Sequence, residues 1–154
     1  MITSNNLNQA RKEIQKLKKE GRQVVVLAQD DNFNRKIFET KNVDVVVGLE
    51  FSKNIWKDPL KQRDSGLNEV LCKLAKENNI KIGVDVSNII KLDKLEKARV
   101  LARVRQNIFL CKKAGCKMVI FNDNKYDYNK QEIMSFFISL KGSTKQAREA
   151  FKNL

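Results

Sequence analysis

Four acidic side chains lie at or near the ends of the apolar segments of this sequence, where parallel strands would finish. They are Asp30, Glu50, Asp85 and Asp123. Functional sites of α/β proteins form at the carboxyl ends of their strands. Carboxylates gathered there could hold Mg²⁺ and support phosphodiester hydrolysis. The competing interpretation, which we favour, is that these residues cap helices and turns, because no paired acidic motif on one strand supports a metal site.

The residue types present exclude several kinds of site. The chain contains no histidine, which rules out Ser-His-Asp and Cys-His nucleophile systems and histidine-ligated zinc. Its glycines form neither a P-loop nor a dinucleotide-binding motif, so a nucleotide cofactor is not indicated. Cys72, Cys111 and Cys116 lie in apolar contexts without zinc-site spacing, and we expect buried free thiols.

Basic residues give the stronger signal. Lysine and arginine total 31 against 18 acidic residues, a formal net charge of +13. This surplus suggests a polyanionic partner, nucleic acid ahead of membrane, although an ordinary solvated surface is the alternative. Trp56, Tyr126 and Tyr128 are available for stacking on bases. The residues predicted to contact phosphate lie in one loop and one long helix: Lys57, Lys61, Arg63, Arg99, Arg103, Arg105 and Lys113.

The segments that must position these residues alternate between apolar strands and amphipathic helices. Strands are predicted over residues 24–28, 43–47, 80–86 and 118–121. The main helices are predicted over residues 4–20, 66–78, 93–114, 131–140 and 143–152. This alternation predicts parallel β-α units in one domain over residues 1–154, because no linker interrupts it. Four strands cannot close an eight-stranded barrel, so the sheet is either open or a partial barrel.

A basic turn leads into the helix at 66–78 and lies between two apolar strands. Ser65 or Asp64 is expected to cap this helix, and Val70 is placed on its apolar face. Asp64 would orient Arg63 or cap the helix, and would not itself touch nucleic acid. No apolar run approaches the ~20 residues of a membrane span and no signal peptide is evident, so we expect a cytoplasmic protein.

Three segments carry a likeness to a known family: the strand VDVVVG at 43–48, the turn and helix RDSGLNEVLCKLA at 63–75, and the strand IKIG at 80–83. They resemble the thirty-kilodalton, TIM-barrel-like protein subunit of archaeal and eukaryotic ribonuclease P. The sequence EKAR at 96–99 also opens the long helix as it does in that family. The likeness runs from about residue 23 to residue 140, and the turn with its flanking strands is its most specific part.

The resemblance implies a truncated TIM-barrel-like α/β fold with a mostly parallel sheet, in a subunit that is not catalytic alone. In that family the RNA subunit, with Mg²⁺, removes the 5′ leader of precursor tRNA. The implied partners are this RNA, precursor tRNA within the complex, and a small ferredoxin-like protein subunit in a heterotetramer. The chain itself would bind no metal or other cofactor. A Mg²⁺-dependent phosphodiesterase and a general RNA-binding protein are the alternatives.

Two departures from the family pattern affect these expectations. The family's first strands and helices have no counterpart before residue 4, so the barrel is expected to be truncated on its N-terminal side. The residues Asn122-Asp123-Asn124 replace a small serine-rich turn, so contacts made by that turn are not carried over to this chain.

Overall fold

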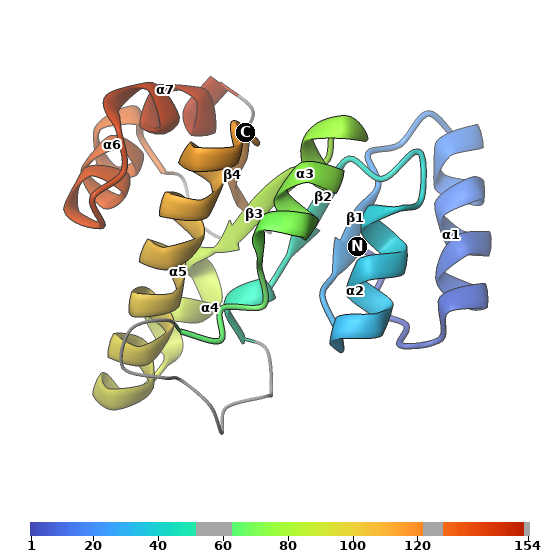
Figure 1. Ribbon diagram of the computed structural model, residues 1–154, viewed down its shortest axis with the longest axis horizontal. Helices are drawn as coiled ribbons and strands as arrows, with labels where there is room; N and C mark the ends of the chain where they lie inside the picture. Colours follow the sequence, from blue (N-terminus) through green and yellow to red (C-terminus); the bar gives the residue numbers. More distant parts are fainter. Residues whose placement is uncertain (52–62, 122–127, 153–154) are drawn as a thin grey trace.

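A four-stranded parallel sheet forms the centre of the protein (Figure 1). The computed structural model describes residues 1–51, 63–121 and 128–152. The strands are β1 (Val25–Leu27), β2 (Val45–Val47), β3 (Lys81–Asp85) and β4 (Met118–Phe121), and they lie side by side in sequence order. Val46 of β2 pairs with Val26 on one side and with Ile82 on the other. The parallel α/β sheet predicted from the sequence is confirmed.

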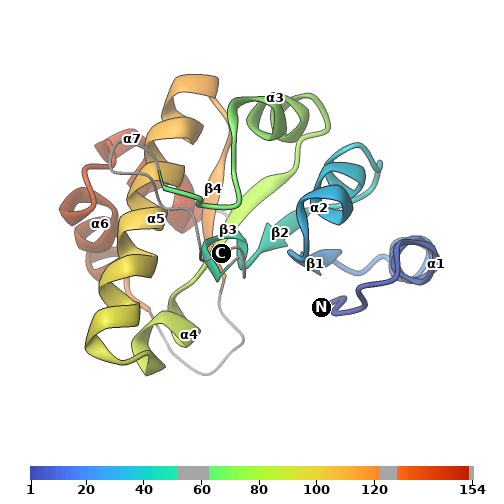
Figure 2. The ribbon, with the colours of Figure 1, turned by 60° about the horizontal axis from the view of Figure 1, so that its bottom comes forward.

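One helix precedes β1 and others follow each strand, and together they cover one face of the sheet. They are α1 (Leu7–Lys19), α2 (Asp31–Phe38), α3 (Glu69–Glu77), α4 (Val86–Lys91), α5 (Lys94–Ala114), α6 (Lys130–Ser139) and α7 (Thr144–Lys152), with a 3-10 turn η1 (Leu49–Phe51). Figure 2 shows α2, α3 and α5 along the same side of the strands, while α1 lies at the β1 end. In the described part of the chain, no helix is long and apolar enough to span a bilayer.

The two faces of the sheet carry separate apolar clusters. Val26, Val46 and Ile82 point toward the helices and join the main core, in which Phe38 and Phe137 are fully buried. A smaller cluster on the opposite face is formed by Val25, Val45, Val47 and Val119. Side chains of a strand alternate between faces, so these valine-rich runs, buried on both sides, have the pattern of inner parallel strands.

Helix α3 begins later than the sequence analysis expected. Its N-cap is Asn68, whose Oδ1 accepts a hydrogen bond from the Leu71 amide at 2.9 Å. Neither Ser65 nor Asp64 caps it, because Gly66 between them and the helix has φ +68°, which is incompatible with a right-handed helix. The prediction that Val70 lies on the apolar face of this helix was also wrong, because Val70 is 55% exposed.

Candidate nucleic-acid interface

Two neighbouring side chains of α5 hold the turn that precedes α3. Gln106 accepts a hydrogen bond from the Arg63 amide at 2.6 Å and donates to the Arg63 carbonyl oxygen at 2.7 Å. Asn107 donates to the Ser65 carbonyl oxygen at 3.2 Å. These bonds satisfy main-chain groups that belong to no helix or strand, so they fix the path of the turn. Arg63 is therefore held beside α5, although it is 43 residues away from Gln106 in sequence.

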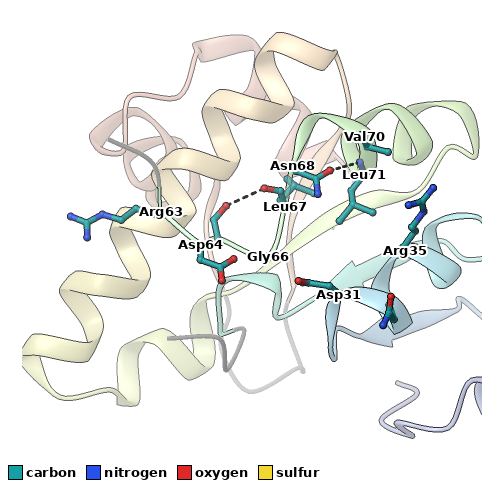
Figure 3. Close-up of a pocket in the computed structure, with 11 residues that line it drawn as sticks. Asp31, Arg35, Arg63, Asp64, Gly66, Leu67, Asn68, Val70 and Leu71 are labelled. Atoms are coloured by element: carbon teal, nitrogen blue, oxygen red, sulfur yellow. Dashed lines mark hydrogen bonds between the residues drawn. The ribbon is translucent and has the colours of Figure 1, made fainter. Parts of the chain in front are cut away.

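Gly66 lets the same turn pass directly against the end of β2. It has φ +68°, and a Cβ built on it would overlap the carbonyl oxygen of Leu49 in η1. Ser65 is 1% exposed, and its hydroxyl donates to the Leu67 carbonyl oxygen while accepting from Gln106 at 3.1 Å. The turn is thus packed between η1 and α5, and it presents Arg63 on the α5 side (Figure 3).

A cavity of about 480 Å³ lies between this turn, α2 and α3, and Arg63 is among the residues that line it. Asp31 and Arg35 face it from α2, and Asp64 and Val70 face it from the turn and α3 (Figure 3). Arg35 forms an ion pair with Glu39 at 3.2 Å. Two acidic and two basic side chains line the cavity: Asp31, Asp64, Arg35 and Arg63.

Basic residues predicted to bind phosphate lie along the outside of α5. Arg99, Gln106 and Lys113 are spaced by seven residues, which is close to two helical turns, so they align on the side that faces the turn and α3. Lys113 forms an ion pair with Glu69 of α3, and this contact lowers the pKa of the Glu69 carboxyl. Arg99 and Arg105 are exposed. The structure therefore places Arg63, Arg99, Arg105 and Lys113 on or beside one helix, and we name these four residues the α5 basic surface.

Phe109 was missed by the sequence analysis. Its side chain is 65% exposed and lies four residues from both Arg105 and Lys113, on the same outer side of α5. The helical period could have revealed it, since the buried residues of this helix follow a different stripe: Val100, Val104, Ile108 and Cys111. An exposed aromatic ring between cations is suited to stacking on an unpaired base.

Arg103 requires a correction. We predicted that it contacts phosphate, but it is 4% exposed and its guanidinium donates to the Glu50 carbonyl oxygen at 3.2 Å. The reason is its helical position, which faces η1 while Arg99 and Arg105 face outward. Arg103 therefore stabilises the end of β2, and we remove it from the predicted phosphate contacts.

Replacing Arg103 with methionine is expected to lower the free energy of unfolding by about 2 kcal/mol, because a buried hydrogen bond from a charged donor is lost. Arg105→Met is the matched control: its side chain is exposed, so stability should change by less than about 0.5 kcal/mol. Urea denaturation followed by circular dichroism measures both. Equal losses in the two variants would contradict the structural role of Arg103.

Of the three acidic residues among these four that the structure describes, Glu50 and Asp85 meet at the strand ends. The Asp85 amide donates to Glu50 Oε1 at 2.9 Å, and both side chains are buried. The two carboxylate oxygens of Asp85 accept hydrogen bonds from Asn88 and cap α4. Burial raises the pKa of Glu50 to about 7, and the nearby charge of Asp85 adds to this effect.

The other two acidic residues do not join this pair as a described metal site. Asp30 caps α2 through the Phe33 amide at 2.9 Å, and Asp123 lies outside the described residues. Within residues 1–51, 63–121 and 128–152, no group of three carboxylates is close enough to hold a metal ion. Asp30 and Asp85 thus have the capping role that we favoured from the sequence.

Comparison with known proteins finds relatives that share one description. The chain is 33% identical to ribonuclease P protein component 3 of Methanococcus vannielii over 119 residues, which is 77% of this chain and 48% of that protein. It is 27% identical over 142 residues to the component 3 of Methanocaldococcus jannaschii, covering 90% of this chain and 57% of that protein. The chain is a homologue of ribonuclease P protein component 3. No family model matches the sequence.

The fold agrees with this homology. A chain of the cryo-EM structure of archaeal ribonuclease P with mature tRNA matches with a TM-score of 0.78 and 25% identity, over 98% of this chain and 62% of that chain. The resemblance to component 3 predicted from the sequence, including its TIM-barrel-like α/β architecture, is confirmed. The chain spans about half the length of the curated component 3 proteins that it matches.

Some predicted contact residues cannot be compared with the structure. Lys57 and Lys61, and the aromatic residues Trp56 and Tyr126, lie outside the described residues. Tyr128 is described, but its ring is partly buried and packs against the main core, which does not favour a stacking role.

The cysteines are buried free thiols, as predicted, but their spacing in the sequence did not indicate that they lie together. The sulfur atoms of Cys72, Cys111 and Cys116 lie within 4.8 Å of one another. Hydrogen bonds with the Cys111 and Cys72 thiols lower the pKa of Cys116, and the contact with Cys116 raises the pKa of Cys111. Sequence spacing did not reveal this cluster because the fold, and not a local motif, brings Cys72 to the other two.

Proposed function

We propose that this protein is a subunit of ribonuclease P that binds the RNA subunit and supports removal of the 5′ leader from precursor tRNA in the cytoplasm. The observation that carries the proposal is the 33% identity to a component 3 protein over 77% of this chain. The net charge of +13 and the match to a chain in an archaeal ribonuclease P with mature tRNA also support it.

The α5 basic surface is the proposed site of contact with the RNA subunit. Its four cations would bind backbone phosphates, while Phe109 would stack on an unpaired base. The hydrogen bonds from Gln106 give Arg63 a fixed position beside this helix, which reduces the conformational entropy lost on binding. Lys57 and Lys61 belong to the segment just before Arg63 and remain predicted phosphate contacts.

The proposed role is to bind and position RNA, with the chemistry left to the RNA and its Mg²⁺. The chain has no histidine that could act as a general base, and its Asp30 and Asp85 carboxylates are already engaged as helix caps. Precursor tRNA, a small ferredoxin-like protein subunit and assembly as a heterotetramer complete the proposal. A complex reconstituted with and without that subunit would show whether it is needed for stable binding.

The double variant Arg99→Ala/Arg105→Ala tests the RNA-binding surface. We expect at least tenfold weaker binding to the cognate RNA subunit, and a salt dependence whose logarithmic slope is smaller by about 1.5, because each lost phosphate contact contributes roughly 0.7–0.9. Filter binding or fluorescence anisotropy at several salt concentrations measures both quantities.

Arg11→Ala/Lys12→Ala is the matched control, since it removes two exposed charges from α1 at the far end of the molecule (Figure 1). Its effect should be small. Equal losses in the two double variants would show that net charge alone governs binding and would contradict a defined surface.

Two further measurements separate the proposal from its alternatives. Protein with Mg²⁺ but without the RNA subunit should leave precursor tRNA intact, whereas cleavage would indicate a protein phosphodiesterase. Binding to an unrelated structured RNA at the same salt concentration should be clearly weaker than binding to the cognate RNA. Similar affinities would indicate a general RNA-binding protein.

A further inference from the structure

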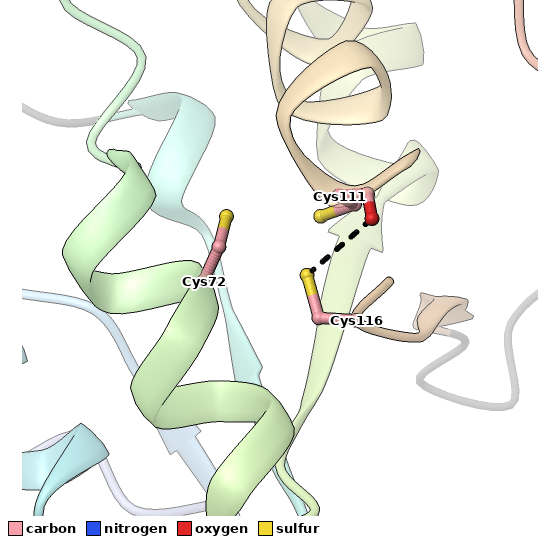
Figure 4. A group of neighbouring side chains, drawn as sticks. All are labelled: Cys72, Cys111 and Cys116. Atoms are coloured by element: carbon pink, nitrogen blue, oxygen red, sulfur yellow. Dashed lines mark hydrogen bonds between the residues drawn. The ribbon is translucent and has the colours of Figure 1, made fainter. Parts of the chain in front are cut away.

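The three cysteines come from three different parts of the fold. Cys72 lies in α3, Cys111 in the last turn of α5, and Cys116 in the connection to β4, and their side chains point toward one another (Figure 4). Cys72 and Cys111 are fully buried and Cys116 is 8% exposed. Among the described residues, this is the only group of three or more potential metal ligands whose ligand atoms lie within 4.8 Å of one another.

The backbone at the end of α5 holds two of these cysteines together. Gly115 has φ +74°, and the amides of Gly115 and Cys116 both donate to the Cys111 carbonyl oxygen, at 2.8 and 3.1 Å. This left-handed turn, which glycine adopts without strain, returns the chain over the end of the helix. Cys116 is therefore placed against Cys111 by main-chain geometry that does not depend on a bound ion.

The spacing of the sulfur atoms suits a metal ion. Thiolates bind zinc-like cations at roughly 2.3 Å, which separates the sulfurs by about 3.8 Å in a tetrahedral site and about 4.0 Å in a trigonal one. The three sulfur atoms lie within 4.8 Å of one another, so they would have to move only slightly closer together to bind one ion. A disulfide would instead use two of the sulfurs and leave the third as a buried thiol, whereas one cation engages all three.

The surroundings favour negative charge on one of the three sulfurs, that of Cys116, whose pKa is lowered. Contact with the Cys116 thiol and burial raise the pKa of Cys72 to about 12 and also raise that of Cys111, so a metal ion would displace protons from these two thiols.

The amine of Lys76 lies beside Gly115, next to Cys116 in the chain: it would be 3.5 Å from a Cβ built on that glycine. A cavity of about 610 Å³ lies between α3 and α5, and its charged lining residues are Lys73, Lys76 and Lys113 together with Glu69 and Glu77, while the cysteines themselves lie behind it. Neighbouring cations stabilise thiolates, which are the form that binds metal.

We infer that Cys72, Cys111 and Cys116 form a binding site for one thiophilic cation of the Zn²⁺ class. Soft thiolate ligands select such cations over Mg²⁺, so the site is distinct from the Mg²⁺ proposed to act with the RNA. A bound ion would tie α3 to the end of α5 and to β4. The ion would stabilise the fold on the side of α5 opposite the exposed Phe109. This metal site does not depend on the proposed function.

Titration of the reduced full-length protein with Cd²⁺ tests the site. We expect sulfur-to-cadmium charge-transfer absorbance that saturates at one equivalent, and competition by Zn²⁺ but not by Mg²⁺. Each of the variants Cys72→Ala, Cys111→Ala and Cys116→Ala should bind at least 100-fold more weakly. Absence of the absorbance, or unchanged affinity in all three variants, would overturn the inference.

A second measurement keeps the test independent of how well the variants fold. In the wild-type protein, one equivalent of Zn²⁺ should slow alkylation of all three thiols at least tenfold and raise the unfolding temperature, as expected for a ligand that binds only the folded state. Alkylation at an unchanged rate would contradict the site. So would recovery of a stable Cys111–Cys116 disulfide, with no Zn²⁺ uptake, after equilibration in a glutathione buffer.

Discussion

Replacing Gly66 with alanine is expected to lower the free energy of unfolding by about 2–5 kcal/mol. Two costs add. A non-glycine residue at φ +68° is strained by about 1–2 kcal/mol. The new methyl group would also overlap the Leu49 carbonyl oxygen, and forcing extra atoms into a packed site costs about 1–3 kcal/mol. Urea denaturation followed by circular dichroism measures the loss. The slope of the unfolding free energy against urea concentration should not change.

Gly21→Ala separates these two costs. Gly21 has nearly the same backbone angle, φ +67°, but a Cβ built there would meet no atom within 4 Å. We expect a loss of about 1–2 kcal/mol from strain alone. Similar losses in the two variants would mean that the close approach of Gly66 to η1 does not constrain the turn.

The same pair of variants connects the fold to the proposed function. Gly66 lies between Ser65, which α5 holds through Gln106, and Leu67, which is buried in the main core. Moving the turn away from η1 would shift Arg63 relative to Arg99 and Arg105. Folded Gly66→Ala protein should therefore bind the RNA subunit more weakly than Gly21→Ala at equal salt.

Features set by nearby residues could be predicted from the sequence. The long helix predicted over residues 93–114 is bounded by local signals: Asp93 accepts hydrogen bonds from the amides of Leu95 and Glu96 at its start, and Gly115 ends it at φ +74°. The strands were also recognisable, since short valine-rich runs bounded by polar residues are typical of buried parallel strands. In each case the deciding residues lie within a few positions of one another.

Features set by distant residues could not be predicted in this way. Arg103 is buried because it bonds to Glu50, 53 residues away, and its exposed neighbours Arg99 and Arg105 have the same residue type. Cys72 meets Cys111 only after α3 and α5 pack together. Even the start of α3 depends on a long-range contact, because Gly66 adopts its left-handed backbone against η1. Family resemblance supplied the arrangement of strands but not these contacts.

Replacing Glu50 with glutamine is expected to make the protein more stable than wild type by about 3 kcal/mol above pH 7, with no such advantage at pH 4.5. The pKa of Glu50 is about 7 in the folded protein, chiefly because of burial, against 4.5 for an unperturbed carboxyl. Between these values the folded state keeps a proton that the unfolded state has lost. Wild-type stability due to this group therefore falls as pH rises through this window, by about 1.4 kcal/mol for each pKa unit.

Glutamine should preserve the structure around this position. Its carbonyl oxygen can accept the Asp85 amide as Glu50 Oε1 does at 2.9 Å, and its neutral amide resembles the protonated acid. The quantity to measure is the difference in unfolding free energy between variant and wild type from about pH 4.5 to about pH 8. Other groups that titrate in this range then cancel because they are common to both proteins.

Glu69→Gln is the control for this pH dependence. Glu69 is exposed and its ion pair with Lys113 lowers its pKa, so it contributes stability that is lost only as pH falls below 4.5 toward its folded value. Its difference from wild type should stay flat between about pH 5 and pH 8. A flat difference for Glu50→Gln as well would mean that Glu50 is ionised in the folded protein at neutral pH, held by the amide of Asp85 and by water that enters beside it.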